Sequence, residues 1–280
     1  MPDSSQLPHL LRLLDDDDAV VREAVLAELA SFGAGLGGEL ERMNLVLSTD
    51  QTVLLGEYTR ARVRAWLLDG WSAWFAIPDE KEKLEAALTL IAEYQENRQR
   101  PGHLRRLLDG LATEYRALHQ RPDLRELSRF LFTRKKLTGA QQDYYDPRNS
   151  NLSYVIEHRR GIPISLACVY MLVGDRLGLQ IDGCNFPGHF LAMATVDERP
   201  IIIDCFHGGL FLDDTLLARY MDPVAVSVAH LTTLRSDSAT IVARVVRNLV
   251  NAYRTVGRPE ESDLMKQLLE MMGVSRGEED

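Results

Sequence analysis

Apolar positions at helical spacing mark the first part of the chain. Leucines gather in Leu10–Leu14, and Val21, Val25 and Leu29 follow at intervals of four. Apolar side chains three or four residues apart lie on one face of a helix. The acidic run Asp15–Asp18 separates these two stretches. We therefore predict two helices, with the acidic run capping the second helix rather than binding a metal.

Helical periodicity continues to about residue 135. It is clear in 80–97 and 103–120, with breaks at Pro78 and at Pro101–Gly102. Three tryptophans lie close together in the preceding helix, and large aromatic side chains of this kind usually pack in a core. We expect them to pack there rather than to form a ligand platform; they are Trp66, Trp71 and Trp74.

The pattern changes near Gly139. Turn-forming and aromatic residues fill 141–155, and a continuous apolar stretch then predicts a buried helix that ends near Gly178. Three short strand-like runs follow, separated by Pro187–Gly188 and by Asp197–Pro200; they are 180–186, 189–196 and 200–206. Helical spacing returns from about 239. A buried helix followed by an antiparallel meander indicates an α+β fold.

Four regions follow from this division. Residues 1–135 are expected to be a helical region whose first helices resemble a single HEAT-type helical hairpin. Residues 136–235 are expected to form the α+β core, with a central helix packed on a small antiparallel sheet. Residues 236–272 are expected to form a C-terminal helical hairpin bent at Gly257–Pro259, and 273–280 a disordered tail.

Composition excludes several classes of protein. The formal net charge is −9, which does not favour nucleic-acid binding, because that affinity rests on basic residues neutralising phosphates. No apolar stretch approaches the roughly 20 residues of a membrane span, and no secretion signal is visible. Cys168, Cys184 and Cys205 are an odd number and form no disulfide framework. We expect a cytoplasmic protein without a membrane segment.

A series of short motifs between about 140 and 210 is recognisable. The run YYDPRNSNLSYVIEHRRGIPISLACVYMLVGDRLGLQIDGCNFPGHFLA is followed by IIIDCFHGG. In this order and spacing the motifs resemble the SirB-type branch of the transglutaminase-like superfamily. The helical segments LEAALTLIAEYQ and LSRFLF resemble the same family more loosely. The resemblance implies a papain-like core.

Active members of that superfamily use a Cys–His–Asp triad. The resemblance implies that His189 occupies the position of the base and Asp204 that of the residue that orients it. The strand prediction agrees independently, because a hairpin that joins the two runs can place both side chains on one face of the sheet.

The nucleophile position departs from the family pattern of Gly, one residue, Cys, three residues and a small residue. Laid over this sequence without a gap, the pattern matches Gly161 and Ala167 and places Pro163 where the cysteine belongs. Proline suits the first helical turn. Ser165, in that turn, is a weak alternative nucleophile that we expect to bond backbone groups instead. Cys168, about 7.5 Å further along the helix axis, is a second weak alternative that we expect to be core.

Several polar residues around this helix are candidates for binding. Arg160 is suited to holding a carboxylate or phosphate, or to forming an ion pair with Glu157 or Asp204. Asn149 is expected to shape the turn after the preceding proline, and His207 either shapes a loop or lines a pocket. No zinc-site spacing or phosphate loop is present, so no metal or cofactor is expected.

Two functional hypotheses remain. The first is a non-catalytic transglutaminase-like module that binds another protein as an adaptor, with flanking helices suited to protein contacts. The second is an amide hydrolase or peptidase-like enzyme that uses the His189–Asp204 pair with a displaced nucleophile or an activated water. Pro163 at the position of the nucleophile favours the non-catalytic module. The joint presence of His189 and Asp204 favours the enzyme.

Overall fold

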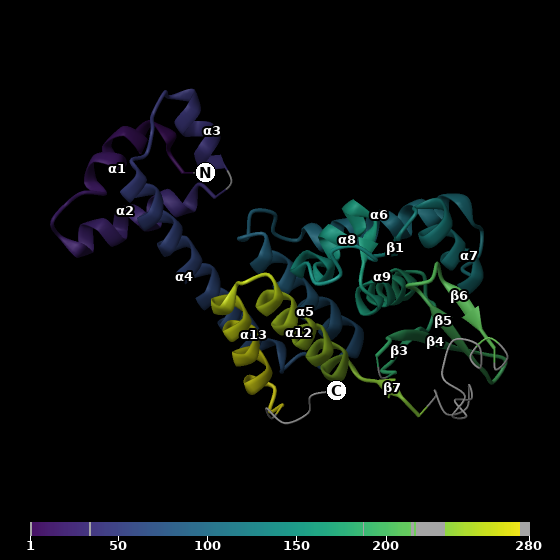
Figure 1. Ribbon diagram of the computed structural model, residues 1–280. Coiled ribbons are helices and arrows are strands. Elements are labelled where there is room, and N and C mark those ends of the chain that lie inside the picture. Colours follow the sequence, from purple (N-terminus) through teal and green to yellow (C-terminus); the bar gives the residue numbers. More distant parts are fainter. Residues whose placement is uncertain (1, 34, 187, 214–215, 217–232, 275–280) are drawn as a thin grey trace. The chain divides into compact units, whose positions relative to one another are not determined.

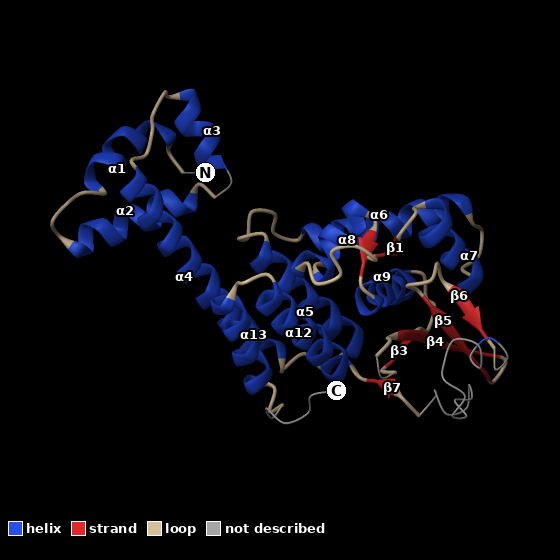
Figure 2. Cartoon of the chain, in the orientation of Figure 1, coloured by secondary structure: helices blue, strands red, loops and turns tan. Residues whose placement is uncertain are grey.

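The computed structural model describes residues 2–33, 35–186, 188–213, 216 and 233–274. The chain divides into two compact units, and each is a body by itself. The first unit comprises Met1–Gly70 and Glu93–Pro101, and the second comprises Trp71–Ala92 and Gly102–Asp280. Figure 1 gives the labels of the elements, and Figure 2 shows that the strands all belong to the later part of the chain.

The first unit is helical. Leucine and valine side chains of its first helices bury a common core that includes Leu7, Leu14 and Leu29. The Asp18 side chain accepts a hydrogen bond from the Val20 backbone N–H at 2.8 Å, which confirms the expected N-cap. Its elements are η1 (Ser4–Gln6), α1 (Leu7–Leu13), α2 (Ala19–Ser31), α3 (Gly35–Arg42) and the first part of α4 (Thr49–Trp74). That this start is HEAT-like stays a prediction.

Helices also make up most of the second unit. They are α5 (Glu80–Gln95, whose last residues belong to the first unit), α6 (His103–Leu118), α7 (Leu124–Ser128), η2 (Arg129–Arg134), η3 (Pro147–Ser150), α8 (Leu152–His158), α9 (Pro163–Arg176), α12 (Ser238–Thr255) and α13 (Pro259–Met271). The indoles of Trp71 and Trp74 are buried and stacked, with centroids 5.2 Å apart. These two tryptophans therefore pack in a core, as expected.

A five-stranded sheet of order β6-β5-β4-β3-β7 lies in the second unit, and all its pairs are antiparallel. The β4–β5 hairpin turns through Asp197 and Glu198, which both have positive φ, as a tight two-residue hairpin requires. The strands are β3 (Asp182–Cys184), β4 (Leu191–Val196), β5 (Arg199–Asp204), β6 (Leu210–Leu212) and β7 (Arg235–Ser236), with a separate parallel pair of β1 (Thr138–Gly139) and β2 (Arg160–Gly161).

Helix α9 is the centre of the second unit. Every residue from Pro163 to Gly174 is buried, and the helix contacts β3 and β4 of the sheet (Figure 1). Gly174 is required by this packing, because a Cβ there would lie 2.4 Å from Ile181 Cδ1. A mostly helical chain with a small antiparallel sheet against one buried helix is the α+β architecture that the sequence predicts.

The remaining expectations concern the ends and a turn. Helices α12 and α13 pack against each other, and Gly257 between them has a φ of 73°. Pro187 and residues 275–280, which carry part of one predicted turn and most of the predicted tail, lie outside the described residues. Among the helices that the structure describes, none combines the length and apolar character needed to cross a bilayer.

Candidate functional site

His189 lies in the loop between β3 and β4, two residues before β4 begins. Its backbone N–H donates to the Phe186 carbonyl oxygen at 3.2 Å. The Arg244 guanidinium of α12 holds the same loop, because it donates to the Phe186 carbonyl oxygen at 2.8 Å and also to Asn185 Oδ1. The next residue, Phe190, is buried. The described part of the loop that carries His189 is therefore held by its own backbone, by Arg244 of α12 and by the buried Phe190.

Asp204 ends β5 and shapes the turn that follows. Its Oδ1 atom accepts hydrogen bonds from the backbone N–H groups of Phe206 at 3.0 Å and of His207 at 3.1 Å. A carboxylate that accepts from donors two and three residues further on reverses the chain locally. The turn then passes through Gly208 and Gly209, whose φ values of 78° and 71° favour glycine.

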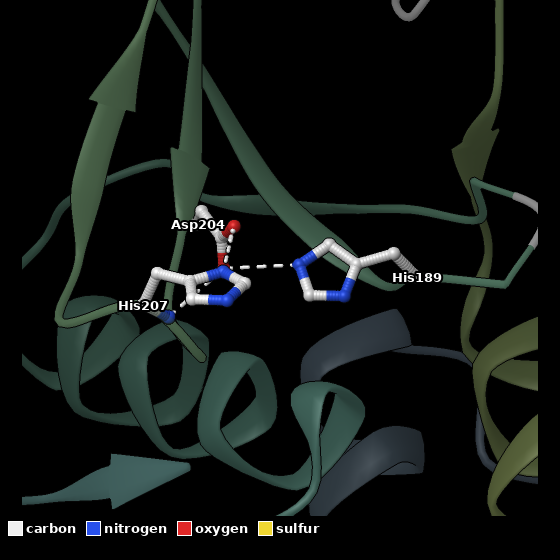
Figure 3. Close-up of side chains that lie close together, drawn as sticks. All are labelled: His189, Asp204 and His207. Atoms are coloured by element: carbon white, nitrogen blue, oxygen red, sulfur yellow. Dashed lines mark hydrogen bonds and ion pairs between the residues drawn. The ribbon is translucent and has the colours of Figure 1, made fainter. Parts of the chain in front are cut away.

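Three side chains converge at this edge of the sheet (Figure 3). His189 Nε2 lies 3.0 Å from Asp204 Oδ1, and His207 Nδ1 lies 2.7 Å from Asp204 Oδ2. The Asp204 side chain is 5% exposed, whereas His189 is 21% and His207 is 47% exposed. We call these three residues the His–Asp–His cluster. It has a buried carboxylate and two imidazoles that remain accessible from solvent.

The carboxylate of the cluster is held ionised. Burial acts to raise the pKa of Asp204, but its interactions with His189 and His207 outweigh burial, so its pKa is below the usual range. His189 Nε2 is buried and lies 3.0 Å from Asp204 Oδ1, and this contact is the largest of the interactions that lower the pKa of Asp204. Its geometry departs from that of a regular hydrogen bond, and Nε2 has no other such partner among the described residues.

The sequence identified His189 and Asp204 as a pair, and the structure brings them together. It adds His207, which the sequence left ambiguous between loop shaping and pocket lining. The sequence feature that could have predicted this contact is the spacing Asp204-x-x-His207. When the backbone between these residues forms a turn, the His207 side chain comes back to the Asp204 carboxylate. One ligand atom from each of the three residues lies within 4.8 Å of the others, so the cluster has the composition and spacing to hold a metal ion.

The start of α9 has a different chemical character. Pro163 is its first residue and Ile162 its N-cap, and both are buried. Ser165 is fully buried, and its Oγ has no hydrogen-bond partner within the described part of the chain. The expected bond from this hydroxyl to the backbone is therefore wrong. Buried in this way, Ser165 has no access to a substrate.

None of the three cysteines is activated. None of them forms a disulfide and all are buried, and Cys168 is on the fully buried part of helix α9. Burial raises the pKa of the Cys168 thiol to about 12 and that of Cys184 to about 11, and it raises the pKa of Cys205 well above its usual value. A thiol is nucleophilic only as the thiolate. The cysteines are accordingly core residues, as the sequence suggested.

Phe206 connects the start of α9 with the cluster. Its ring lies edge-on to the His189 imidazole, with centroids 6.1 Å apart. A Cβ on Gly139 would lie 2.6 Å from the same ring. Gly139 in turn pairs with Gly161, two residues before Pro163. The Phe206 ring therefore contacts both His189 and the β1–β2 pair, whose second strand leads into α9.

The residues proposed for binding have structural partners. Glu157 Oε1 lies 2.8 Å from His103 Nε2, and the Asn149 amide donates to the carbonyl oxygens of Asp143 and Tyr144, so it shapes the turn as expected. Arg160 makes no ion pair with a carboxylate of the described residues, and its charge instead helps to lower the pKa of Asp146.

The expected ion pairs of Arg160 with Glu157 or Asp204 are therefore wrong. Arg159 adopts the left-handed conformation, with a φ of 60°, and ends α8. This reversal places Arg160 in β2, paired with β1. Glu157 remains on α8 and pairs with α6 through His103, while the two histidines of the cluster occupy the Asp204 carboxylate.

Comparison with known proteins agrees with this architecture. The family model described as the transglutaminase-like superfamily matches residues 100–249, a region that includes α6–α9, the sheet and the start of α12. The chain therefore belongs to the transglutaminase-like superfamily. Within it, the chain is homologous to the UPF0162 proteins: the one from Xylella fastidiosa is 35% identical over 214 residues, which are 70% of this chain and 74% of that protein.

Two further relatives cover less of the chain. The UPF0162 protein of Vibrio cholerae is 31% identical over 147 residues, which are 50% of this chain and 54% of that protein. F-box only protein 21 of Mus musculus is 28% identical over 153 residues, which are 50% of this chain and 23% of that protein. No solved structure is significantly similar to the chain.

Proposed function

We propose that this protein is a non-catalytic member of the transglutaminase-like superfamily that binds another protein as an adaptor in the cytoplasm. The observation that carries the proposal is that the described start of the central helix offers no accessible thiol or hydroxyl and that the three cysteines are buried. Pro163 is the first residue of the central helix, all three thiols are buried, and Ser165 is fully buried. Three reduced cysteines also suit a reducing compartment.

A surface of tyrosine and arginine is our candidate for the partner-binding site. It consists of two pairs of residues that are close in the sequence, Tyr144 with Tyr145 and Arg148 with Tyr154, and we call these four residues the aromatic patch. The rings of Tyr144 and Tyr145 are 5.4 Å apart and Tyr145 is 55% exposed, and the Arg148 guanidinium lies 4.9 Å from the centroid of Tyr154. Tyrosine and arginine are enriched among the residues that dominate binding energy at protein interfaces.

The comparison with F-box only protein 21 supports a modular role. The region shared with that protein is 23% of its length, so a fold of this kind occurs there as one part of a larger chain. A region that is combined with other domains is suited to contributing a binding surface.

Photo-crosslinking tests the patch. A photoreactive amino acid replaces Tyr145 in one variant and Val256, which is 47% exposed on the same unit, in a control. We expect defined protein adducts in cells from position 145 and not from position 256. Failure to crosslink a protein at 145, or the same adducts from both positions, would overturn the assignment of the patch.

Thiol alkylation tests the non-catalytic part of the proposal. Site-resolved alkylation of the native chain is compared with that of His189→Ala from mildly acidic to mildly basic pH. We expect all three cysteines to react slowly in both proteins until they unfold, because their pKa values are raised. A cysteine that reacts rapidly at low pH and loses this reactivity without His189 would show a displaced Cys–His pair and a catalytic protein.

The alternative is an amide hydrolase that activates water. It is favoured by one observation, the partial exposure of His189 beside the ionised Asp204, because an accessible imidazole oriented by a carboxylate is a general base. Hydrolysis of peptide or amide substrates by the purified chain, lost in His189→Ala, would favour this function over the adaptor.

A further inference from the structure

We propose that the His–Asp–His cluster binds a divalent transition-metal ion, with Zn²⁺ as its representative, through His189, Asp204 and His207. This proposal goes beyond partner binding and does not depend on it. The sequence predicted no metal, because its histidines and cysteines show none of the familiar zinc-ligand spacings. The three ligands instead come from a loop, the end of a strand and the turn after that strand (Figure 3).

The spacing of the ligand atoms fits a shared ion. A tetrahedral metal held at about 2.0–2.2 Å by nitrogen and oxygen places neighbouring ligand atoms roughly 3.3–3.6 Å apart. Here His189 Nε2 is 3.0 Å from Asp204 Oδ1 and His207 Nδ1 is 2.7 Å from Asp204 Oδ2, and one ligand atom of each residue lies within 4.8 Å of the others. The three side chains are therefore close enough to bind one ion after the imidazoles move apart from the carboxylate by about half an ångström.

A buried nitrogen without a hydrogen bond is the second observation. His189 Nε2 is shielded from solvent, and no described group gives it a hydrogen bond of acceptable geometry, although Asp204 Oδ1 is only 3.0 Å away. Buried polar atoms are nearly always satisfied, and an exception calls for an explanation such as an ion. A cation that accepts the lone pair of His189 Nε2 would satisfy this atom.

The donor set selects the class of ion. Two imidazoles and one carboxylate are typical ligands of zinc and non-haem iron, whereas calcium and magnesium prefer oxygen alone. The backbone N–H groups of Phe206 and His207 already fix the Asp204 carboxylate, as ligand-orienting hydrogen bonds do at metal sites. The exposed side chain of His207 leaves one side of the cluster open to water or a small anion that completes the coordination.

The alternative to a bound metal ion is a proton shared between an imidazole and the Asp204 carboxylate. Without a metal, His207 Nδ1 and Asp204 Oδ2 at 2.7 Å form an ordinary hydrogen bond, and the cluster is then only a polar support of the turn. The two states differ in what a ligand substitution does. Removing one histidine from a metal site weakens ion binding, whereas removing it from a hydrogen-bonded turn changes stability and leaves metal affinity as it was.

Isothermal titration of Zn²⁺ into the chelator-treated full-length chain tests the proposal. The variants are His189→Ala and His207→Ala, and the control is His9→Ala, because His9 is a histidine of the other unit, outside the cluster. We expect one ion per chain for the native protein and for His9→Ala, with affinity weakened at least about 10-fold in each ligand variant. Circular dichroism checks that each variant is folded.

Replacing Zn²⁺ by Co²⁺ gives a second readout. We expect a visible ligand-field absorption in the native chain and in His9→Ala that is lost in His207→Ala, whose side chain is the most exposed of the three. No binding to the native chain, or binding that survives both ligand substitutions, would overturn the site. Crosslinking from position 145 does not involve these residues, so either proposal can fail while the other stands.

Discussion

The start of helix α9 and the edge of the sheet at Asp204 belong to the same superfamily core, but they differ in chemistry. At the helix start the side chains are apolar or unpartnered, with Pro163 as the first residue and the buried Ser165 close to it in the first turn. At the sheet edge, Asp204 contacts two imidazoles and two backbone N–H groups.

The physical reason for this difference lies in what each residue does for folding. Proline at the first helical position costs no hydrogen bond, because that N–H has no partner within the helix. Asp204 carries several interactions at once, so its loss would leave donors and imidazoles unpaired. The comparison teaches that the buried carboxylate of Asp204 supports the backbone as well as the two imidazoles, whereas the start of α9 forms without a polar side-chain cap.

The largest expected effect is the loss of stability on substitution of Asp204. Asp204→Ala removes the acceptor of two turn N–H groups and the partner of both histidines, and we expect a loss of about 3 kcal/mol in the free energy of unfolding. Urea denaturation measures it. Asp204→Asn keeps an oxygen acceptor for the turn and should lose about 1–2 kcal/mol. Equal losses in the two variants would mean that charge alone matters.

Gly139→Ala tests the link between the two regions. Its Cβ would lie 2.6 Å from the Phe206 ring, so the ring or the β1–β2 pair must move, and we expect a loss of about 1–3 kcal/mol. Gly110→Ala is the control, because a Cβ there meets nothing within 4 Å and alanine favours a helix. If both variants keep the native stability in thermal unfolding, Phe206 is not confined as described.

Pro163→Cys tests whether a thiol at the start of α9 is activated by the helix N-terminus and by His189. A thiol near a helix N-terminus and an imidazole has a lowered pKa, so alkylation at neutral pH should be at least about 10-fold faster than at the three native cysteines. The same reactivity in Pro163→Cys combined with His189→Ala would mean that the histidine does not contact the new thiol. If the introduced thiol reacts as slowly as Cys168, the two regions are not aligned for catalysis.

The smallest expected effect concerns a second carboxylate. Burial acts to raise the pKa of Asp146, but its bonds with Arg148 outweigh burial and its pKa is lowered. A lowered folded-state pKa stabilises the protein above the unfolded value, and this stabilisation is lost as the pH falls through the folded value. Arg148 is 62% exposed, so Asp146→Asn should cost less than about 1 kcal/mol at neutral pH.

The acid limb of a stability profile separates the contributions of charge and hydrogen bonding at Asp146. The difference between Asp146→Asn and the native chain should shrink below about pH 4, because the native carboxyl then becomes protonated. A difference that stays constant through this range would show that the substitution acts through the hydrogen bond that Asp146 accepts from the Arg148 backbone N–H rather than through charge.

Local pattern was sufficient for much of the fold. The continuous apolar run after Gly161 predicted a buried helix, and the short apolar runs around Leu191 and Ile202 predicted an antiparallel meander. The acidic cap at Asp18 was also predictable. In each case the relevant interaction joins residues close in the chain or follows from one periodicity.

The sequence by itself determined the α+β class, the superfamily motifs and the pair of His189 and Asp204. Only the tertiary structure decided that His207 joins them, that Arg160 pairs with neither expected acid, and that Ser165 lacks a partner among the described residues. The reason is physical. Periodicity reports which face of an element is buried, but side-chain partners depend on how loops and turns bring separate elements together.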